Sequence, residues 1–407
     1  MIDSQIVSSP VGEKRGIRTR WSLLALAMGT FCFGMTEYVM MAILPDMARD
    51  FHVSIPQAGH LISSYALGVC VGAPLLAMLG RTWPLRRILL VLMAIVIVAG
   101  IGMVFSASYG VMLVARFFAG MPHGAFFGVG SLVASRISKP EKVTLSIAFM
   151  CSGMTVANLI GIPFGTWITA LFSWRMVFAI STLCAILTLI AIIAWVPKLP
   201  PLPNVGVKGT FRFLTHLAPW LIVIATMMGN GGIFAYYSYI SPLLTQVSGV
   251  PEMMMTLMMV LAGAGMVAGN LCGGKLSDKV GAGHAGFYLV ILMAVSLLLM
   301  YFFAPIPWIA VPLMMLTTFG LFGVSSPQQL LLLKYSEGGE LMGGAMVQVA
   351  FNFGNAIGAF AGGIPISLGM PIQTTALVGL FFVLIAVAGY IWFCHRYEKR
   401  KINKKAS

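Results

Sequence analysis

The sequence predicts an all-α integral membrane protein with twelve transmembrane helices in two six-helix bundles. Three observations predict this class: the composition, the spacing of the apolar runs, and the side on which basic residues fall. Of the 407 residues, 59% are hydrophobic and 9% are charged, and the mean hydropathy is +0.95. Soluble proteins carry about a quarter charged residues, so this chain has too few polar side chains to cover an aqueous surface.

Twelve apolar runs are long enough to cross a bilayer, which takes about 20 residues of helix. They are expected at 21–44, 57–79, 88–106, 110–132, 143–168, 175–195, 219–243, 253–274, 285–304, 308–333, 343–367 and 373–394. The tenth and eleventh runs are the least regular, because Pro312, Pro327 and several glycines interrupt them. No segment has the alternating polarity of a strand, and backbone groups in lipid must be satisfied internally, so every run is expected to be helical.

The basic residues predict the orientation of these runs. If the runs alternate in direction, 22 of the 25 Lys and Arg residues lie on the side of both termini, and only Arg49 and Arg175 lie on the other. The remaining one, Arg116, falls inside the fourth run. Cytoplasmic loops carry the excess of Lys and Arg, so both termini are expected in the cytoplasm. The first twenty residues lack the apolar core of a signal peptide, so the first run is expected to be retained.

The charge and the cysteines exclude several other classes. The net charge of +14 does not indicate nucleic-acid binding, because the basic residues are scattered in short loops with no basic face; anionic lipid and topology explain it. The six cysteines lie in or beside apolar runs without Cys-x-x-Cys spacing, and are interpreted as small buried hydrophobes. No metal and no cofactor are expected.

The two bundles are expected at 1–196 and 218–407, the second with a basic cytoplasmic tail. Four prolines in 197–217 indicate a linker without folded structure. A weak internal repeat supports the division, since an offset of 197 carries Asn158 onto Asn355. The halves are therefore expected to be parallel repeats, an arrangement that suits a transporter with its site between them.

One carboxylate lies inside a predicted span. Glu37 is the only ionisable side chain of 21–44, and such a group costs several kcal/mol unless it is protonated, paired or facing water. At roughly 1.5 Å per residue, Glu37 and Arg116 lie at similar depths of about 10 Å and 6–9 Å below the outer side. We expect Glu37 to bind the coupling proton and Arg116 to stabilise its charged form. A fixed structural pair, a tie of Arg116 to a carbonyl, and a permanently protonated Glu37 are the alternatives.

Other polar and small residues inside the runs are candidates for substrate binding and helix packing. Spacings of four and seven place His123 on the stripe of Arg116; it is interpreted as a packed histidine or as a proton or substrate contact. Tyrosines and amides complete the substrate-binding candidates, which are Tyr38, His123, Asn158, Asn230, Tyr236, Tyr237, Asn352 and Asn355. The alternatives are that the tyrosines of the seventh run belong to the aromatic belt of the membrane interface and that the amides join helices. Glycines that allow close helix contact are Gly120, Gly124, Gly161 and Gly165. Trp174 and Arg175 are interpreted as an interfacial anchor.

The stretch Gly274-Lys-Leu-Ser-Asp278-Lys-Val-Gly281 follows the eighth run. It resembles the Gly-x-Leu-(small)-Asp-(basic)-x-Gly signature of the major facilitator superfamily, found between the second and third helices of each half. The resemblance implies a conformational latch centred on Asp278 and bounded by Gly274 and Gly281. In the first half Arg81 stands where this Asp is expected, so a latch there cannot be the usual one.

Two further stretches carry the resemblance. Residues 116–124 resemble the Arg-x-x-x-Gly-x-x-x-Gly motif of the fourth helix, and 153–165 are a degraded match to the antiporter motif of the fifth, with Ala157 replacing its central Gly. Across the whole chain the resemblance is closest to the drug:proton antiporter family, in its arabinose- and sugar-efflux-like branch. Residues 33–37, 122–130 and 152–158 resemble that branch in particular.

The resemblance implies a multi-pass protein of the bacterial inner membrane with the major facilitator fold. It would export a small solute, a sugar or an amphipathic drug-like compound, in exchange for protons by alternating access. The expected partners are that solute, protons and membrane lipid, without nucleic acid, and a monomer is expected. The alternatives are an exporter or symporter of nucleosides or other metabolites, and a non-transporting sensor or scaffold. No enzyme is expected, because the sequence has no nucleophile with a base, no nucleotide-binding loop and no metal-ligand spacing.

Overall fold

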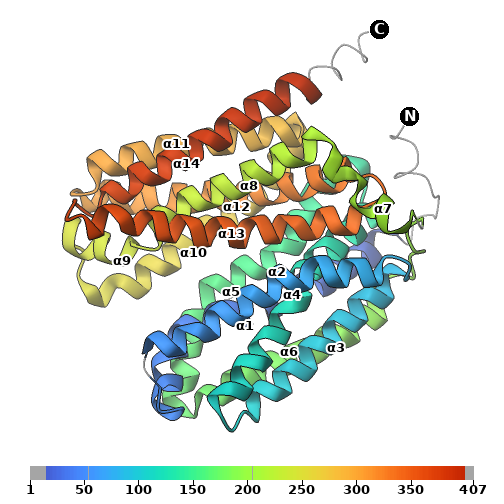
Figure 1. The fold of residues 1–407 in the computed structure, drawn as a ribbon, viewed down its shortest axis with the longest axis horizontal. Coiled ribbons are helices and arrows are strands. Elements are labelled where there is room, and N and C mark those ends of the chain that lie inside the picture. The colour runs from blue at the N-terminus through green and yellow to red at the C-terminus, as the bar shows by residue number, and fades with distance from the viewer. Residues whose placement is uncertain (1–14, 54, 204, 399–407) are drawn as a thin grey trace. The chain divides into compact units, whose positions relative to one another are not determined.

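The computed structural model describes residues 15–53, 55–203 and 205–398, and long helices make up most of this part of the chain (Figure 1). Twelve of them are long and apolar enough to cross a membrane. They are α1 Arg15–Asp50, α2 Ile55–Gly80, α3 Leu85–Val104, α4 Tyr109–Ile137, α5 Val143–Leu171, α6 Trp174–Trp195, α8 Leu217–Tyr237, α10 Met255–Val280, α11 Ala282–Phe303, α12 Pro307–Tyr335, α13 Glu340–Ser367 and α14 Thr374–Phe393. The described residues form no strand, so the predicted all-α class with twelve spans is confirmed.

Short helical segments join the long ones. The remaining elements are η1 Pro140–Lys142, α7 Gly206–Phe211, η2 Arg212–Thr215, α9 Ile240–Pro242, η3 Leu243–Val247, η4 Glu252–Met254 and η5 Cys394–Glu398. The prediction of an unfolded linker at 197–217 is wrong in part, because α7 and η2 form there. The hydroxyl of Thr210 donates to the carbonyl of Gly206 at 2.9 Å, and Thr210 is buried, so α7 folds against its surroundings.

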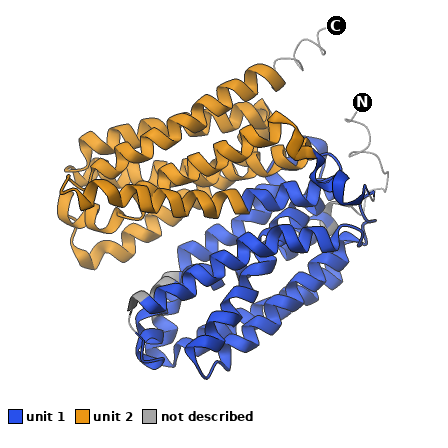
Figure 2. Cartoon of the chain, in the orientation of Figure 1, with its two compact units in different colours: residues 1–212, 337–348 blue, residues 213–336, 349–407 orange. Residues whose placement is uncertain are grey.

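The chain divides into two compact units, shown in blue and orange in Figure 2. Unit 1 consists of residues 1–212 and 337–348, and unit 2 of residues 213–336 and 349–407. The beginning of α13 therefore groups with unit 1, where it packs on glycines of α4. A methyl group at Gly124 would lie 3.3 Å from Cβ of Gln348, and one at Gly128 would lie 2.9 Å from the carbonyl oxygen of Leu341. The bundle limits 1–196 and 218–407 stay predictions.

One end of unit 1 joins the beginning of α1 to the ends of α4 and α6. The hydroxyl of Ser22 donates to the carbonyl of Trp195 at 2.7 Å, and the rings of Trp21 and Trp195 lie 4.9 Å apart. Thr19 donates to the carbonyl of Ile137 at 3.4 Å. These contacts fix α1 antiparallel to α4 and α6, as expected from spans that alternate in direction.

The opposite end of unit 1 is tied by one carboxylate. Asp50, the last residue of α1, accepts from Nη1 of Arg175 at 2.6 Å and from Nε1 of Trp174 at 3.2 Å. Nη2 of Arg175 also donates to the carbonyl of Ser106, just after α3, at 3.1 Å. Trp174 is only 4% exposed, so its interpretation as an interfacial anchor is wrong: its indole packs inside the helix bundle and holds the beginning of α6 to α1.

Glycines allow two helix pairs to approach backbone to backbone. In unit 1 a methyl group on Gly68 of α2 would meet the carbonyl oxygen of Phe117 of α4, and one on Gly72 would meet the backbone of Met121. In unit 2 glycines of α10 face carbonyls of α12 in the same way, in the pairs Gly265 with Met315, Gly269 with Phe319 and Gly273 with Gly323. A spacing of four on both partners keeps each contact on one helix face.

Candidate functional site

Arg116 is fully buried in α4 and joins two neighbouring helices. Its Nε donates to the carbonyl of Leu61 in α2 at 3.1 Å, and its Nη1 donates to the carbonyl of Thr36 in α1 at 2.7 Å. The guanidinium carbon lies 4.5 Å from the centre of the Tyr65 ring, while Nη2 has no hydrogen-bond partner. The two carbonyl groups and the face of the Tyr65 ring thus stabilise the guanidinium cation, which would be unfavourable inside a membrane-spanning helix without them.

Glu37 follows Thr36 in α1, and its carboxylate faces His123 of α4. Oε2 of Glu37 lies 3.6 Å from Nδ1 of His123 and has no hydrogen-bond partner, although this oxygen is buried. The histidine side chain is fully buried, whereas that of Glu37 is 20% exposed. Nδ1 of His123 also forms a hydrogen bond of 2.9 Å with the hydroxyl of Tyr65. Glu37 is therefore partly accessible on one side, and on the other it lies close to a nitrogen that also bonds to Tyr65.

Within the part of the chain that the structure describes, Glu37 and Arg116 form no direct ion pair, because Arg116 donates to backbone carbonyls and the carboxylate of Glu37 lies beside His123. The geometry instead has a chain of contacts from Arg116 to the ring of Tyr65, from its hydroxyl to His123, and from His123 to Glu37. Arg116 donates to backbone carbonyls, which is one of the alternatives considered from the sequence. Through its bond to the carbonyl of Thr36, Arg116 holds the backbone one residue before Glu37.

Aromatic side chains enclose His123. Its ring lies 5.1 Å from that of Phe127 in a stacked arrangement and 5.2 Å from that of Phe33. Phe33 in turn contacts Phe126 at 5.2 Å between ring centres. These rings exclude water from one side of the histidine, so charges near it interact more strongly than they would in water.

The polar candidates of unit 2 have unused hydrogen-bonding atoms. The side-chain nitrogen of Asn230 in α8 donates to the carbonyl of Thr226 at 2.7 Å, but its oxygen is buried without a partner. The hydroxyl of Tyr236 and the side-chain oxygen of Asn355 are also buried without a partner, and Tyr237 donates to the sulfur of Met259 at 3.8 Å. Buried polar atoms nearly always have partners, so these three atoms are available to a water molecule or a solute.

Close packing brings the candidates on α8 and α13 next to one another. Methyl groups on three glycines of α13 would meet carbonyl oxygens of α8, in the pairs Gly354 with Met227, Gly358 with Gly231 and Gly362 with Ala235. Asn352 and Asn355 therefore lie on a helix in backbone contact with the helix of Asn230.

The remaining candidates of unit 1 lie on α1, α5 and α4. Tyr38 is buried, and a methyl group on Gly161 would lie 3.9 Å from its Cβ. Asn158 is half-buried on the same helix as Gly161, and Gly165 is buried. On α4, a methyl group on Gly120 would meet the carbonyl oxygen of Tyr65, so this glycine brings the tyrosine ring near Arg116.

The predicted latch residues lie at the ends of α2 and α10. Gly274 is buried and Asp278 half-buried in the last turns of α10, and Gly281 ends that helix with a φ of 92°, a conformation that favours glycine. Arg81 follows α2 and lines a cavity of about 10 Å³ together with Glu340. Nε of Arg81 and Oε2 of Glu340 are both buried without a partner.

Sequence reasoning missed two residues of these sites. Tyr65 contacts both Arg116 and His123, but an uncharged tyrosine in an apolar run has no signal that separates it from a packing residue. Glu340 is absent from the candidate latch residues because it lies just before the eleventh predicted run, outside the expected span. A count of acidic residues next to predicted spans would have found it.

The chain matches the family model described as Major Facilitator Superfamily over residues 26–346. It is 40% identical to AraJ of Escherichia coli (strain K12), which is named as a transporter, over 93% of this chain and 96% of AraJ. It is 34% identical to the inner membrane transport protein YdhP of the same organism over 91% of this chain and 96% of YdhP.

A more distant relative and a solved structure complete the comparison. A chloramphenicol resistance protein of Streptomyces lividans is 29% identical over 63% of this chain and 67% of its own length. The fold matches that of the Escherichia coli fucose:proton symporter FucP with a TM-score of 0.75 at 13% identity, over 91% of this chain and 98% of FucP. The similarity to FucP, at 13% identity, concerns the fold alone.

Proposed function

Since this chain belongs to the Major Facilitator Superfamily and is a multi-pass membrane transporter, we propose that it exports a small solute in exchange for protons by alternating access. The observation that carries the proton-coupling part is the Glu37 carboxylate, with its buried Oε2 next to Nδ1 of His123. Relatives from bacteria, one of them named as an inner membrane transport protein, support placement in the bacterial inner membrane.

In this proposal Glu37 binds and releases the coupling proton. The charged carboxylate accepts a hydrogen bond from His123 when Nδ1 carries the ring proton. When Glu37 is protonated and His123 carries its ring proton on Nε2, Nδ1 instead accepts from the hydroxyl of Tyr65, which is 2.9 Å away. Arg116 positions this pair, because its bond to the carbonyl of Thr36 fixes the turn of α1 that bears Glu37. The aromatic rings around His123 keep the proton from escaping on that side.

The solute contacts are proposed on the polar groups of both halves. Asn230, Tyr236 and Asn355 offer unpartnered buried atoms, and Tyr38, His123, Asn158, Tyr237 and Asn352 are the other proposed contacts. Amides and hydroxyls suit a sugar, whereas the methionine and phenylalanine side chains around them suit an amphipathic compound. A relative named for chloramphenicol resistance supports the amphipathic class.

The conformational latch is proposed at two places. Asp278, between Gly274 and Gly281, serves the second half as the family motif implies. In the first half Arg81 replaces the aspartate, and we propose that it acts with Glu340 across their shared cavity. That cavity holds about one water molecule, which would join Nε of Arg81 to Oε2 of Glu340.

The test is transport into inverted membrane vesicles under an imposed pH gradient, with sugars, nucleosides and cationic dyes as solutes. We expect gradient-dependent flux of at least one solute, abolished in Glu37→Gln. Glu141→Gln is the matched control, because Glu141 is exposed in η1 and its loss should leave flux unchanged. Solute flux in the wild-type protein that is the same with and without the pH gradient would contradict proton coupling.

Two other functions remain as alternatives in the same assay. A symporter or exporter of nucleosides or other metabolites would show flux of those solutes, with the opposite response to the gradient if it is a symporter. A sensor or scaffold would show no flux at all, and its activity would survive Glu37→Gln.

A further inference from the structure

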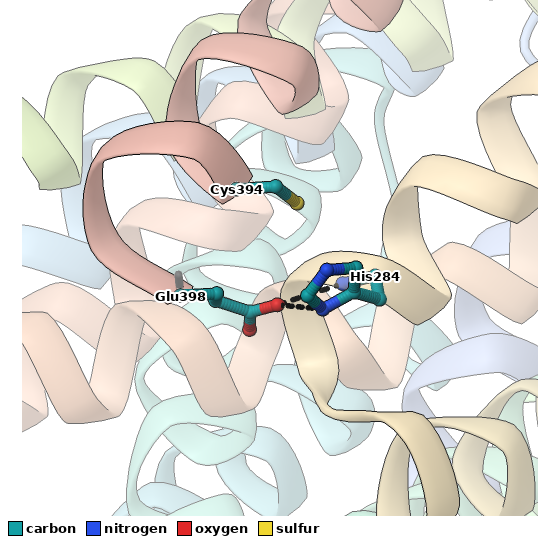
Figure 3. Close-up of side chains that lie close together, drawn as sticks. All are labelled: His284, Cys394 and Glu398. Carbon is teal, nitrogen blue, oxygen red and sulfur yellow. Dashed lines mark hydrogen bonds and ion pairs between the residues drawn. The ribbon is translucent and has the colours of Figure 1, made fainter. Parts of the chain in front are cut away.

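Three side chains of metal-ligating type converge in unit 2, beside the C-terminal end of α10, where a methyl group on Gly281 would lie 3.6 Å from Oε1 of Glu398. His284 lies in the first turn of α11, and Cys394 and Glu398 lie in η5, which continues α14. One ligand atom from each residue lies within 4.8 Å of the other two. Figure 3 shows the thiol of Cys394 and the carboxylate of Glu398 on the same side of η5, both toward the imidazole of His284.

Glu398 already has a structural role in this cluster. Its Oε1 accepts from the backbone N–H of Gly283 at 2.8 Å, and its Oε2 accepts from that of His284 at 3.1 Å. Oε2 also contacts Nδ1 of His284. A carboxylate at a helix N-terminus is favourable, and these bonds hold it in one orientation. They explain Glu398 and His284, but they do not use the sulfur of Cys394.

We propose that His284, Cys394 and Glu398 bind one divalent transition-metal ion of the zinc class. Imidazole nitrogen, thiolate sulfur and carboxylate oxygen are the three ligand types that zinc takes in proteins, commonly with water in the fourth position. One thiolate and one carboxylate supply two negative charges, which balance the charge of the ion. The side chain of His284 is 33% exposed, which gives an ion access from solvent.

The binding step is a simple exchange without oxidation or reduction. The ion replaces the proton on Sγ of Cys394, and that proton passes to the solvent. The neutral imidazole moves its proton from Nδ1 to Nε2, which frees the Nδ1 lone pair for the ion. Glu398 keeps its backbone hydrogen bonds and uses a remaining lone pair, so the cluster needs only small side-chain movements.

Metal binding would join the end of the chain to the beginning of α11. Cys394 and Glu398 are four residues apart and share one face of a helical turn, while His284 is more than a hundred residues earlier in the sequence. An ion held by both segments stabilises unit 2 by mass action. The site shares no residue with the proposed proton-binding and solute-binding groups, so a zinc-binding measurement tests it separately from transport.

The experiment measures zinc binding to the purified full-length protein in detergent after chelator treatment. Isothermal titration calorimetry should give one Zn²⁺ per chain, and Co²⁺ should give the near-ultraviolet charge-transfer absorption of a cobalt–thiolate bond. Cys394→Ser should remove that absorption and weaken zinc binding at least tenfold. His284→Gln should weaken zinc binding to a similar extent while leaving a thiol available.

Cys272→Ser is the matched control, because Cys272 is an exposed thiol in α10 of the same unit. It should leave both the stoichiometry and the cobalt absorption unchanged. Size-exclusion profiles show whether each variant is folded, and the histidine variant keeps the test decisive if the cysteine variant is not. The proposal is overturned if the wild-type protein binds no Zn²⁺, or if binding survives both Cys394→Ser and His284→Gln.

Discussion

Tyr65 is the residue that connects the cation of unit 1 to its proton-binding candidates. Its ring lies against the guanidinium of Arg116, and its hydroxyl bonds to Nδ1 of His123. The ring and the hydroxyl therefore have separate roles: the ring stabilises a buried charge, and the hydroxyl decides which partner Nδ1 of His123 has. The two roles can be separated by removing one oxygen atom.

Tyr65→Phe keeps the ring on Arg116 and removes the hydroxyl. We expect the free energy of unfolding to fall by no more than about 1 kcal/mol, which is the usual net contribution of one hydrogen bond to stability. Proton-driven transport should fall by a factor of about 5–30, as expected for 1–2 kcal/mol, with an altered pH profile, because His123 loses its alternative partner. The measurement is flux against pH in inverted vesicles beside a melting curve in detergent.

Tyr109→Phe provides the comparison for that experiment. The hydroxyl of Tyr109 donates to the carbonyl of Gln57 at 2.5 Å, at the end of unit 1 where Asp50 binds Arg175. The chemical change is the same. The hydroxyl of Tyr109 also lies 3.4 Å from Nδ1 of His60, but His60 is not one of the proposed proton-binding groups, so the pH profile should match that of the wild type. Equal effects of both substitutions on the profile would contradict a role for Tyr65 in proton handling.

At this scale the sequence allowed only part of the site to be predicted. The position of Glu37 in an apolar run, and a depth similar to that of Arg116, follow from counting residues along two helices. The partners of each side chain do not, because they depend on how each helix is rotated about its axis. A rotation set by the glycine contacts of α2 and α4 turns Arg116 toward carbonyls and places Tyr65 beside it.

Among the helices, α8 and α13 approach each other backbone to backbone where the solute-binding candidates of unit 2 lie. Three glycines of α13, spaced by four, each face a carbonyl of α8. Without a hydrophobic driving force inside a membrane, such helix pairs are held by packing at short range. The glycines of α13 therefore set how closely the backbone that bears its amides approaches α8.

Gly358→Ala should destabilise the protein by about 1–3 kcal/mol, the usual cost of overpacking. The added methyl group would meet the carbonyl oxygen of Gly231, so one helix must move away from the other. Gly59→Ala is the matched control, since a methyl group there has no atom within 4 Å, and replacing a helical glycine should help by about 0.5–1 kcal/mol. Melting temperatures of both variants check this; equal values would contradict the packing role of Gly358.

The helices themselves were predictable because each is a long apolar run, and hydropathy alone identifies such runs. The short helix α7 was not, because its six residues include two glycines and follow several prolines. Its stability comes from tertiary contact, as the burial of Thr210 indicates. The burial of Trp174 escaped prediction for a similar reason, since its partner Asp50 is distant in sequence.

For the molecule as a whole, the important feature is that α13 belongs to both units. Its first residues group with unit 1, and the remainder groups with unit 2. Arg81 and Glu340 share a cavity at the beginning of this helix. A change in charge there is therefore expected to affect a helix that continues into the second unit.

Arg81→Glu and Glu340→Arg should each reduce stability and transport, because each places two like charges around one small cavity. The double substitution restores opposite charges and should recover much of the loss, with a coupling energy of about 0.5–3 kcal/mol. Melting curves and flux of the four proteins give this coupling. Arg87→Glu combined with Glu340→Arg is the control, since Arg87 is exposed; recovery in that pair would contradict a specific partnership.

The packing of residues 341–348 on Gly124 and Gly128 has a practical consequence for producing the protein in pieces. A fragment that stops in the linker contains α4 but lacks the segment that covers these glycines. Expressed by itself, such a fragment leaves a strip of bare backbone on α4 open to other chains and should aggregate or be degraded. Co-expression with a fragment that begins at the linker supplies the missing segment, so the yield of the first fragment should depend on the presence of the second.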